Sequence, residues 1–322
     1  MSYASAKHID ASIIPVVDIE PLRKTGDVRR TAETLLRAVE NVGFFYVINH
    51  GIPNAVIDNA RVAAKRFFDC PLDQKNEVAM DEHHRGFLAV GQSKMYDNAH
   101  ADLKESFVWG LELADTDPRL NSNPFLVANR WPAFDPGFKD EVYPYLEACN
   151  ACGKDLFKAF ATAMDIAAGS FNHSFDAPIS RGSLVYYPPQ PVELGDDQFG
   201  VAPHTDFGCL TLLCQDDIGG LQVQDKHGDW VTAHPIENTV VVNVGDLLQR
   251  WTNDRFRSTP HRVINTSRRE RYSLVAAVDP DFETVVDPSV VCKGNDKAKF
   301  EATTCGEYVL GRFDKSFEYR KK

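Results

Sequence analysis

The stretch GVAPHTDFGCLTLLC, residues 200–214, places His204 and Asp206 two positions apart, directly before an apolar run. Side chains at i and i+2 of an extended chain point to the same side, so these two groups can share one metal ion while Thr205 points away. A second histidine, His261, stands at the start of another β-branched segment. Two imidazoles and one carboxylate are the ligand set that holds a non-haem Fe(II) and leaves coordination positions open. The sequence therefore predicts a metal site made of these three residues.

The residues around the His-x-Asp pair predict its place in the fold. Residues 200–203 are interpreted as a loop and residues 209–214 as a strand, so we expect the pair where a loop enters a strand. His261 would then arrive by strand packing. Taken alone, a His-x-Asp pair also occurs as ordinary hydrogen-bonded loop residues. The other histidines have no partner at ligand spacing and are interpreted as surface or loop residues: His8, His50, His83, His84, His100, His173, His227 and His234.

Six motifs follow one another in the second half of the chain. They are YYPP at 186–189, PHTD at 203–206, GGLQV at 219–223, NVGDLLQ at 243–249, STPHRV at 258–263 and RYS at 271–273. In this order they resemble the catalytic core of the Fe(II)- and 2-oxoglutarate-dependent dioxygenases, in the branch that contains isopenicillin N synthase and the plant flavonoid and hormone oxygenases. IPVVD at 14–18 and GFFYVINHGI at 43–52 resemble the N-terminal region of that branch. The resemblance covers nearly the whole chain.

The resemblance implies roles for individual residues. The iron ligands of the family match His204, Asp206 and His261. Its clamp for the co-substrate carboxylate matches Arg271 and Ser273, and a guanidinium with a hydroxyl suits a carboxylate because the hydrogen bonds are charge-assisted.

Further matches and departures concern the same pocket. Tyr187 matches a tyrosine that adds a phenolic hydrogen bond to the co-substrate. Val185 stands where plant members usually carry Asn, and LVAA at 274–277 replaces their usual Pro-Phe-Phe, which leaves room in the pocket.

The function implied by the resemblance is oxidation of a small molecule by O2, with Fe(II) as cofactor and 2-oxoglutarate as co-substrate, releasing succinate and CO2. Hydroxylation is the expected outcome, and desaturation or ring closure are alternatives. Isopenicillin N synthase uses its Arg-x-Ser on substrate, so an iron oxidase that needs no 2-oxoglutarate stays open. A more distant alternative is a jelly-roll module that only binds a metal or ligand.

Composition limits the partners and the compartment. The 322 residues carry a formal net charge of −11 and no long basic tract, which argues against nucleic acid or an anionic membrane as partner. The seven cysteines are odd in number and scattered, so a reducing, cytoplasmic setting is expected, and Cys149-x-x-Cys152 is interpreted as a pair of buried helix thiols. We expect a monomer or weak homo-oligomer.

Periodicity predicts an α+β fold with a double-stranded β-helix, or jelly roll, flanked by helices. We expect a mainly helical region at 1–125, supporting helices at 126–180 and the jelly-roll core at 181–322, all packed as one unit. Short β-rich segments separated by Gly, Asp, Asn or Pro turns characterise the core, and a terminal helix is predicted at 297–312. Arg85, Tyr96 and Phe107 are candidates for the substrate pocket, with loop exposure or core packing as the alternative.

Overall fold

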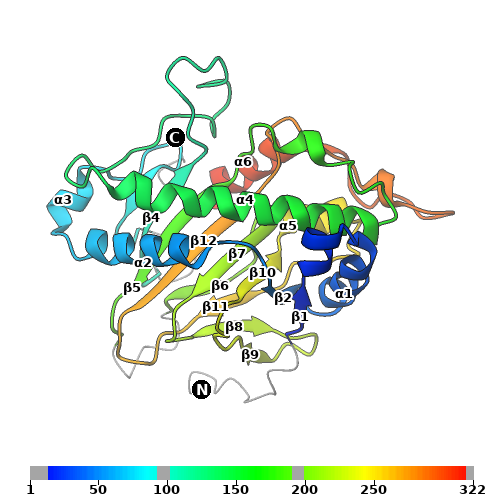
Figure 1. Cartoon of the computed structure of the whole chain (residues 1–322), viewed down its shortest axis with the longest axis horizontal. Coiled ribbons are helices and arrows are strands. Elements are labelled where there is room, and N and C mark those ends of the chain that lie inside the picture. The colour runs from blue at the N-terminus through cyan, green and yellow to red at the C-terminus, as the bar shows by residue number, and fades with distance from the viewer. Residues whose placement is uncertain (1–13, 93–101, 191–198, 317–322) are drawn as a thin grey trace.

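The computed structural model describes residues 14–92, 102–190 and 199–316, and it contains two facing β-sheets (Figure 1). The larger sheet consists, in spatial order, of β1 (Val16–Asp18), β2 (Phe44–Ile48), β10 (Val240–Val244), β7 (Leu210–Gln215), β12 (Arg271–Val278), β5 (Arg181–Tyr187), β4 (Glu105–Gly110) and β3 (Gly86–Leu88). The smaller sheet consists of β6 (Val201–His204), β11 (His261–Val263), β8 (Leu221–Gln224) and β9 (Trp230–Thr232). Apart from the parallel pair β1–β2, neighbouring strands run antiparallel.

Three helices cover the outer face of the larger sheet: α1 (Val28–Asn41), α2 (Asn54–Phe68) and α4 (Phe138–Ala163) (Figure 1). The first begins where the side chain of Asp27 accepts a hydrogen bond from the backbone N–H of Arg30, a typical N-cap. Apolar residues on each helix join residues of the sheet in one large buried cluster. Cys149 and Cys152 lie in this cluster, as buried thiols of α4. The predicted jelly roll flanked by helices is confirmed.

Each central strand of the larger sheet has one face toward the helices and one toward the smaller sheet. On β12, Leu274 and Ala276 belong to the helix-side cluster, whereas Ser273 and Val275 line a cavity between the sheets. This alternation follows from the two-residue period of a strand. It separates the residues packed against the helices from those between the two sheets, where Phe44, Val185, Val201 and Val263 belong to a second buried cluster and also line the cavity.

The remaining short elements connect these layers. They are η2 (Pro21–Thr25), α3 (Leu72–Asn76), η3 (Asn172–Phe175), α5 (Asp246–Trp251), η4 (Pro288–Val291), the paired strands β13 (Val285–Val286) and β14 (Thr303–Thr304), and α6 (Cys305–Ser316). The predicted terminal helix was wrong at its start, because α6 begins at Cys305 and not at Lys297. Thr304 lies in β14, and its hydroxyl accepts a hydrogen bond from the backbone N–H of Glu307, which caps the helix there.

Four strands of the larger sheet, β1 to β4, come from the region predicted to be mainly helical. β4 pairs with β5, and β3 pairs with β4, so residues 86–110 extend the sheet that residues 181–187 begin. The boundaries at 125 and 180 stay a prediction.

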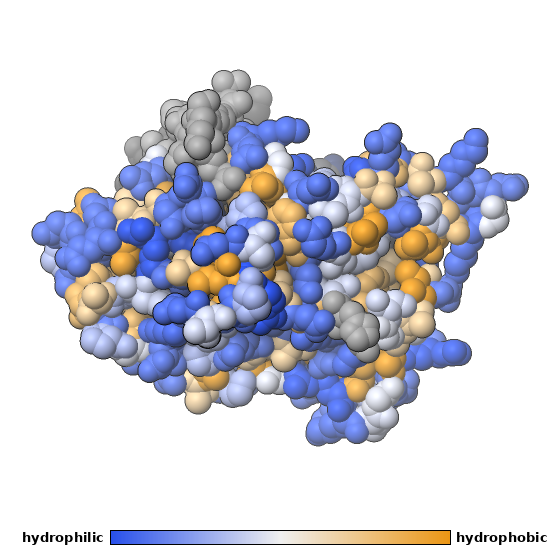
Figure 2. All heavy atoms as spheres, turned by 90° about the horizontal axis from the view of Figure 1, so that it is seen from above, coloured by the Kyte–Doolittle hydropathy of each residue, from blue (hydrophilic) through white to orange (hydrophobic). Residues whose placement is uncertain are grey.

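The surface is mainly hydrophilic on the face shown in Figure 2, where hydrophobic residues form small separate groups. Exposed large hydrophobic side chains are spread over several elements: Val16, Val62, Leu72, Val90, Ile236, Val285 and Val290. Single exposed hydrophobic residues of this kind are ordinary on folded proteins. Within the described residues, no helix is both long and apolar enough to cross a membrane.

A close approach of α4 to the sheet gives a stability prediction. A Cβ atom on Gly153 would lie 2.5 Å from Cγ1 of Val278 on β12, and the stiff β-branched side chain cannot easily move aside. Gly153→Ala should therefore lower the free energy of unfolding by about 1–3 kcal/mol through overpacking. The matched control is Gly311→Ala in α6, where a Cβ atom would meet nothing within 4 Å. We expect it to be neutral or to stabilise by up to about 1 kcal/mol. Urea denaturation of both variants tests this, and equal effects would contradict it.

Candidate active site

Pairing of two short strands brings the three predicted ligands together. In the antiparallel pair β6–β11, His204 and His261 are direct Cα partners, whereas Val263 faces Val201. The spacing is three residues on β6 and two on β11, so β6 carries a bulge beside the site, a feature common next to active sites. Asp206 follows two residues after β6 ends. The expectation that a loop enters a strand at this pair was wrong, because His204 is the last residue of β6 and Asp206 lies in the loop that follows.

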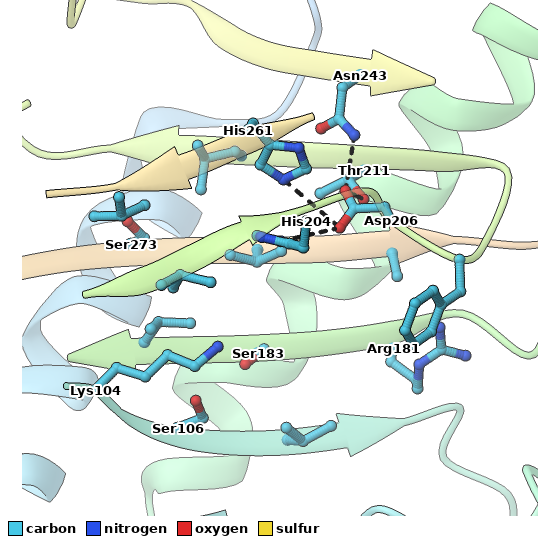
Figure 3. A pocket seen from close by; sticks show the side chains of 18 of the residues that line it. Lys104, Ser106, Arg181, Ser183, His204, Asp206, Thr211, Asn243, His261 and Ser273 are labelled. Atoms are coloured by element: carbon cyan, nitrogen blue, oxygen red, sulfur yellow. Dashed lines mark hydrogen bonds and ion pairs between the residues drawn. The ribbon is translucent and has the colours of Figure 1, made fainter. Parts of the chain in front are cut away.

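The ligand atoms of the three side chains converge. Nε2 of His204 and Nε2 of His261 each lie 3.7 Å from Oδ1 of Asp206 (Figure 3). One ligand atom from each residue can be chosen so that all three lie within 4.8 Å of one another. Such a set, with two imidazoles and one carboxylate, can bind a divalent cation such as Fe(II).

Backbone carbonyls orient both imidazoles. Nδ1 of His204 lies 2.8 Å from the carbonyl oxygen of Ala202, and Nδ1 of His261 lies 3.2 Å from that of Thr259. A hydrogen bond to a carbonyl requires a proton on Nδ1, which leaves the lone pair on Nε2 for a metal. Burial, followed by the nearby His261, lowers the pKa of His204 to about 3. The neutral ring is the form that binds metals.

The carboxylate of Asp206 is held by its other oxygen. Oδ2 accepts hydrogen bonds from Oγ1 of Thr211 at 2.6 Å and from Nδ2 of Asn243 at 2.7 Å. Burial by itself would raise the pKa of Asp206, but the two histidines and these two donors outweigh burial and lower it. Thr211 on β7 and Asn243 on β10 thus keep Oδ1 directed at the histidines. Sequence reasoning gave neither residue a role, although Asn243 opens one of the six motifs.

The loop that carries Asp206 is fixed by the start of α5. Backbone N–H groups of Gly245, Asp246 and Leu247 donate to the carbonyl oxygens of Cys209, Asp206 and Gly208, at 2.9, 2.7 and 3.1 Å. A Cβ atom on Gly245 would lie 2.2 Å from the carbonyl oxygen of Gly208, so only glycine permits this approach. The Asn-Val-Gly-Asp run at 243–246 therefore positions the loop that carries Asp206 by side chain and backbone together.

The second predicted group is built around a fully buried arginine. Nη1 of Arg271 donates to Oγ of Ser273 at 2.6 Å, and Nε donates to the carbonyl oxygen of Gly219. The ring of Tyr187 lies below the guanidinium, 4.6 Å from its Cζ atom. Nη2 is buried and has no hydrogen-bond partner among the described residues. Buried donors are normally satisfied, so this geometry fits a carboxylate ligand in the cavity.

A cavity of about 250 Å³ between the two sheets unites these groups. All six predicted site residues line it: His204, Asp206, His261, Arg271, Ser273 and Tyr187. Apolar side chains supply much of the rest of the wall, among them Phe44, Leu88, Val108, Leu213, Val275 and Phe313. Ala277 also lines it, one of the small residues expected to leave room there.

Neither Phe107 nor Arg85, two of the predicted substrate-pocket candidates, lines the cavity. Phe107 is buried in the helix-side core, and Ser106 and Val108 on either side of it face the cavity instead. Arg85 is buried beside the carbonyl oxygen of Phe125 and does not line the cavity. Tyr96 lies outside the described residues. Sequence reasoning missed several wall residues, namely His84, Lys104, Arg181, Ser183 and Phe313.

Comparison with known proteins agrees with this geometry. Residues 14–134 match the family model described as non-haem dioxygenase in morphine synthesis N-terminal, and residues 182–280 match the 2OG-Fe(II) oxygenase superfamily. A 2-oxoglutarate-Fe(II) type oxidoreductase of Emericella nidulans, hxnY, is 32% identical over 94% of this chain and 90% of its own length.

Solved structures extend the similarity to three dimensions. A full-length Neurospora crassa protein in complex with alpha-KG (2-oxoglutarate) superposes with a TM-score of 0.83 at 31% identity, covering 93% of this chain and 95% of the Neurospora chain. The complex of the same protein with alpha-KG and thymine also gives 0.83, at 29% identity and with 97% and 98% coverage. This chain therefore belongs to the 2OG-Fe(II) oxygenase superfamily, whose members are oxidoreductases that use Fe(II), 2-oxoglutarate and O2.

Proposed function

We propose that His204, Asp206 and His261 hold Fe(II), and that Arg271 and Ser273, assisted by Tyr187, bind the far carboxylate of 2-oxoglutarate. The observation that carries this proposal is the buried, unpartnered Nη2 of Arg271 in the same cavity as the three ligand side chains. When bound, iron and 2-oxoglutarate supply the oxidising power, because reduction of O2 is coupled to conversion of 2-oxoglutarate into succinate and CO2. The product of the reaction is a hydroxylated small molecule.

The protein contributes placement and exclusion of water. Thr211 and Asn243 fix the Asp206 carboxylate, and the carbonyl oxygens of Ala202 and Thr259 fix the two imidazoles. Arg271 is held from three sides before any ligand arrives, so little reorganisation is needed when a carboxylate binds. Apolar walls hold the reacting carbon of the substrate and keep bulk water away.

A small molecule is proposed as the substrate. The cavity of about 250 Å³ is too small for a folded partner, and the similar full-length protein from Neurospora crassa has been solved with thymine. The net charge of −11 disfavours nucleic acid and anionic membranes. We propose a cytoplasmic location because all seven cysteines are free thiols, and a monomer or weak homo-oligomer.

The central experiment measures whether succinate is released when the protein oxidises a substrate. Purified protein with Fe(II) and 2-oxoglutarate should show a weak visible charge-transfer band without oxygen. With oxygen and a metabolite library, O2 consumption should match succinate release. Substrate loss without succinate would identify an oxidase that does not use 2-oxoglutarate. No band, together with unchanged metal content in His261→Ala, would identify a binding module.

Replacement of the buried arginine tests the carboxylate site. Arg271→Gln should weaken 2-oxoglutarate binding by at least about thirtyfold, since losing one partner of a buried charge pair costs about 2–5 kcal/mol. Calorimetric titration of the Mn(II)-loaded protein measures this without turnover. Arg255→Gln is the control, because that side chain pairs with Glu40 and does not line the cavity. Equal affinity of Arg271→Gln and wild type would refute the assignment.

The hydroxyl that orients Asp206 should matter for metal affinity. Thr211→Val removes one donor to Oδ2 at nearly constant volume, and we expect Mn(II) affinity to fall about ten- to a hundredfold. Thr232→Val on β9, which does not line the cavity, is the control and should bind Mn(II) like wild type. Electron paramagnetic resonance of free Mn(II) gives both affinities. A Thr211→Val variant with wild-type affinity would show that Asn243 alone suffices.

A further inference from the structure

A row of polar side chains lies on the wall formed by β4 and β5. Lys104 immediately precedes β4, Ser106 lies on β4, and Ser183 lies on β5, where it is the Cα partner of Val108. All three line the cavity, and Figure 3 shows them directed into the same part of it. This row is separate in sequence from the proposed metal ligands and from Arg271.

These three side chains have hydrogen-bond donors that are not used by the contacts in the structure. The ion-pair partner of Lys104 is Asp102, whose Oδ2 lies 3.7 Å from Nζ, beyond hydrogen-bond distance. Oδ1 of Asp102 meanwhile accepts from the backbone N–H of Ala202. No hydrogen bond from Nζ to another described residue is present, although the lysine side chain is only 14% exposed. An ammonium so far removed from water needs acceptors.

The two serines are similarly available. Oγ of Ser183 has a long contact of 3.5 Å to the neighbouring carbonyl oxygen of Leu184, and Ser106 makes no side-chain hydrogen bond within the described ranges. A lysine with two hydroxyls offers up to five donors, which suits a group with several lone pairs.

The other cations of the cavity are already committed. Arg181 forms a buried ion pair with Asp279, at 3.1 Å between Nη2 and Oδ2. Arg271 faces the proposed co-substrate position. Lys104, whose contact with Asp102 at 3.7 Å is longer than a hydrogen bond, is thus the cavity cation that remains for another ligand.

We propose that Lys104, Ser106 and Ser183 bind the carboxylate of the prime substrate, which is therefore a small organic acid. The apolar side chains of Leu88, Val108 and Phe313, which line the same cavity, receive the rest of the molecule. This inference rests on the proposed function, because it assumes that 2-oxoglutarate occupies Arg271.

The test compares acids with their amides. Full-length protein loaded with Mn(II) and saturating 2-oxoglutarate is titrated by calorimetry with a panel of aliphatic and aromatic monocarboxylates, for example hexanoate and phenylacetate, each beside its primary amide. At least one acid should bind about ten- to a hundredfold more tightly than its amide, the range expected for hydrogen bonds to a charged group. Lys104→Met should abolish that preference and leave 2-oxoglutarate affinity unchanged.

Two further variants complete the design. Ser183→Ala should weaken the acid several-fold and the amide less, which keeps the inference testable if Lys104→Met does not fold. Lys139→Met is the control, because Lys139 pairs with Glu112 and does not line the cavity.

The outcomes separate the two proposals. The inference is overturned if no acid outbinds its amide, if Lys104→Met keeps the preference, or if Lys104→Met loses 2-oxoglutarate. Failure of 2-oxoglutarate to bind wild type counts against the proposed function instead, and the acid-to-amide ratio is then measured with Mn(II) alone.

Discussion

The pairing of β6 with β11 is the constraint on which the site depends. It sets His204 opposite His261, and a slip of one residue would turn one imidazole to the other face of the sheet. Strands of four and three residues cannot fix such a register alone. The bulge in β6, the pairing of β11 with β8, and the hydrogen bond from Oγ1 of Thr259 to the carbonyl oxygen of Val42 secure it from three directions. Residues far apart in sequence therefore converge with defined geometry.

Removing charged side chains from water costs free energy of folding, and this protein does so in its cavity. Asp206 and Arg271 lie in one cavity. Asp206 is held by Thr211 and Asn243 on two neighbouring strands, and Arg271 by Ser273 on its own strand and the carbonyl oxygen of Gly219. Such networks are costly when incomplete, so every partner matters more than a surface contact would. The backbone takes part as well, because Gly245 approaches the loop at Asp206–Gly208 so closely that a side chain there would collide with it.

The sequence predicted that His204, Asp206 and His261 lie together, because the i, i+2 spacing links the first two and the resemblance of the ordered motifs adds the third. It also predicted the strand after the His-x-Asp pair at 209–214, which the structure has as β7, Leu210–Gln215. For Phe107 the sequence left the pocket and core packing as alternatives, and the structure shows core packing. The start of α6 was predictable, since Thr304 and Glu307 have capping-box spacing. The role of Asn243 was not, because its partner Asp206 is 37 residues away in sequence. The place of Lys104 in the cavity was not either, because it depends on the pairing of β4 with β5.

The two-residue alternation of β4 and β5 has an evolutionary consequence. Ser106 on β4 and Ser183 on β5 face the cavity. The next residue on each strand, Phe107 and Leu184, faces the helices. A mutation at Ser106 or Ser183 changes a wall of the cavity and leaves Phe107 and Leu184 in the helix-side core. Single codon changes at these two positions can thus reshape the cavity, while the side chains on the helix side of the same strands are inherited unchanged.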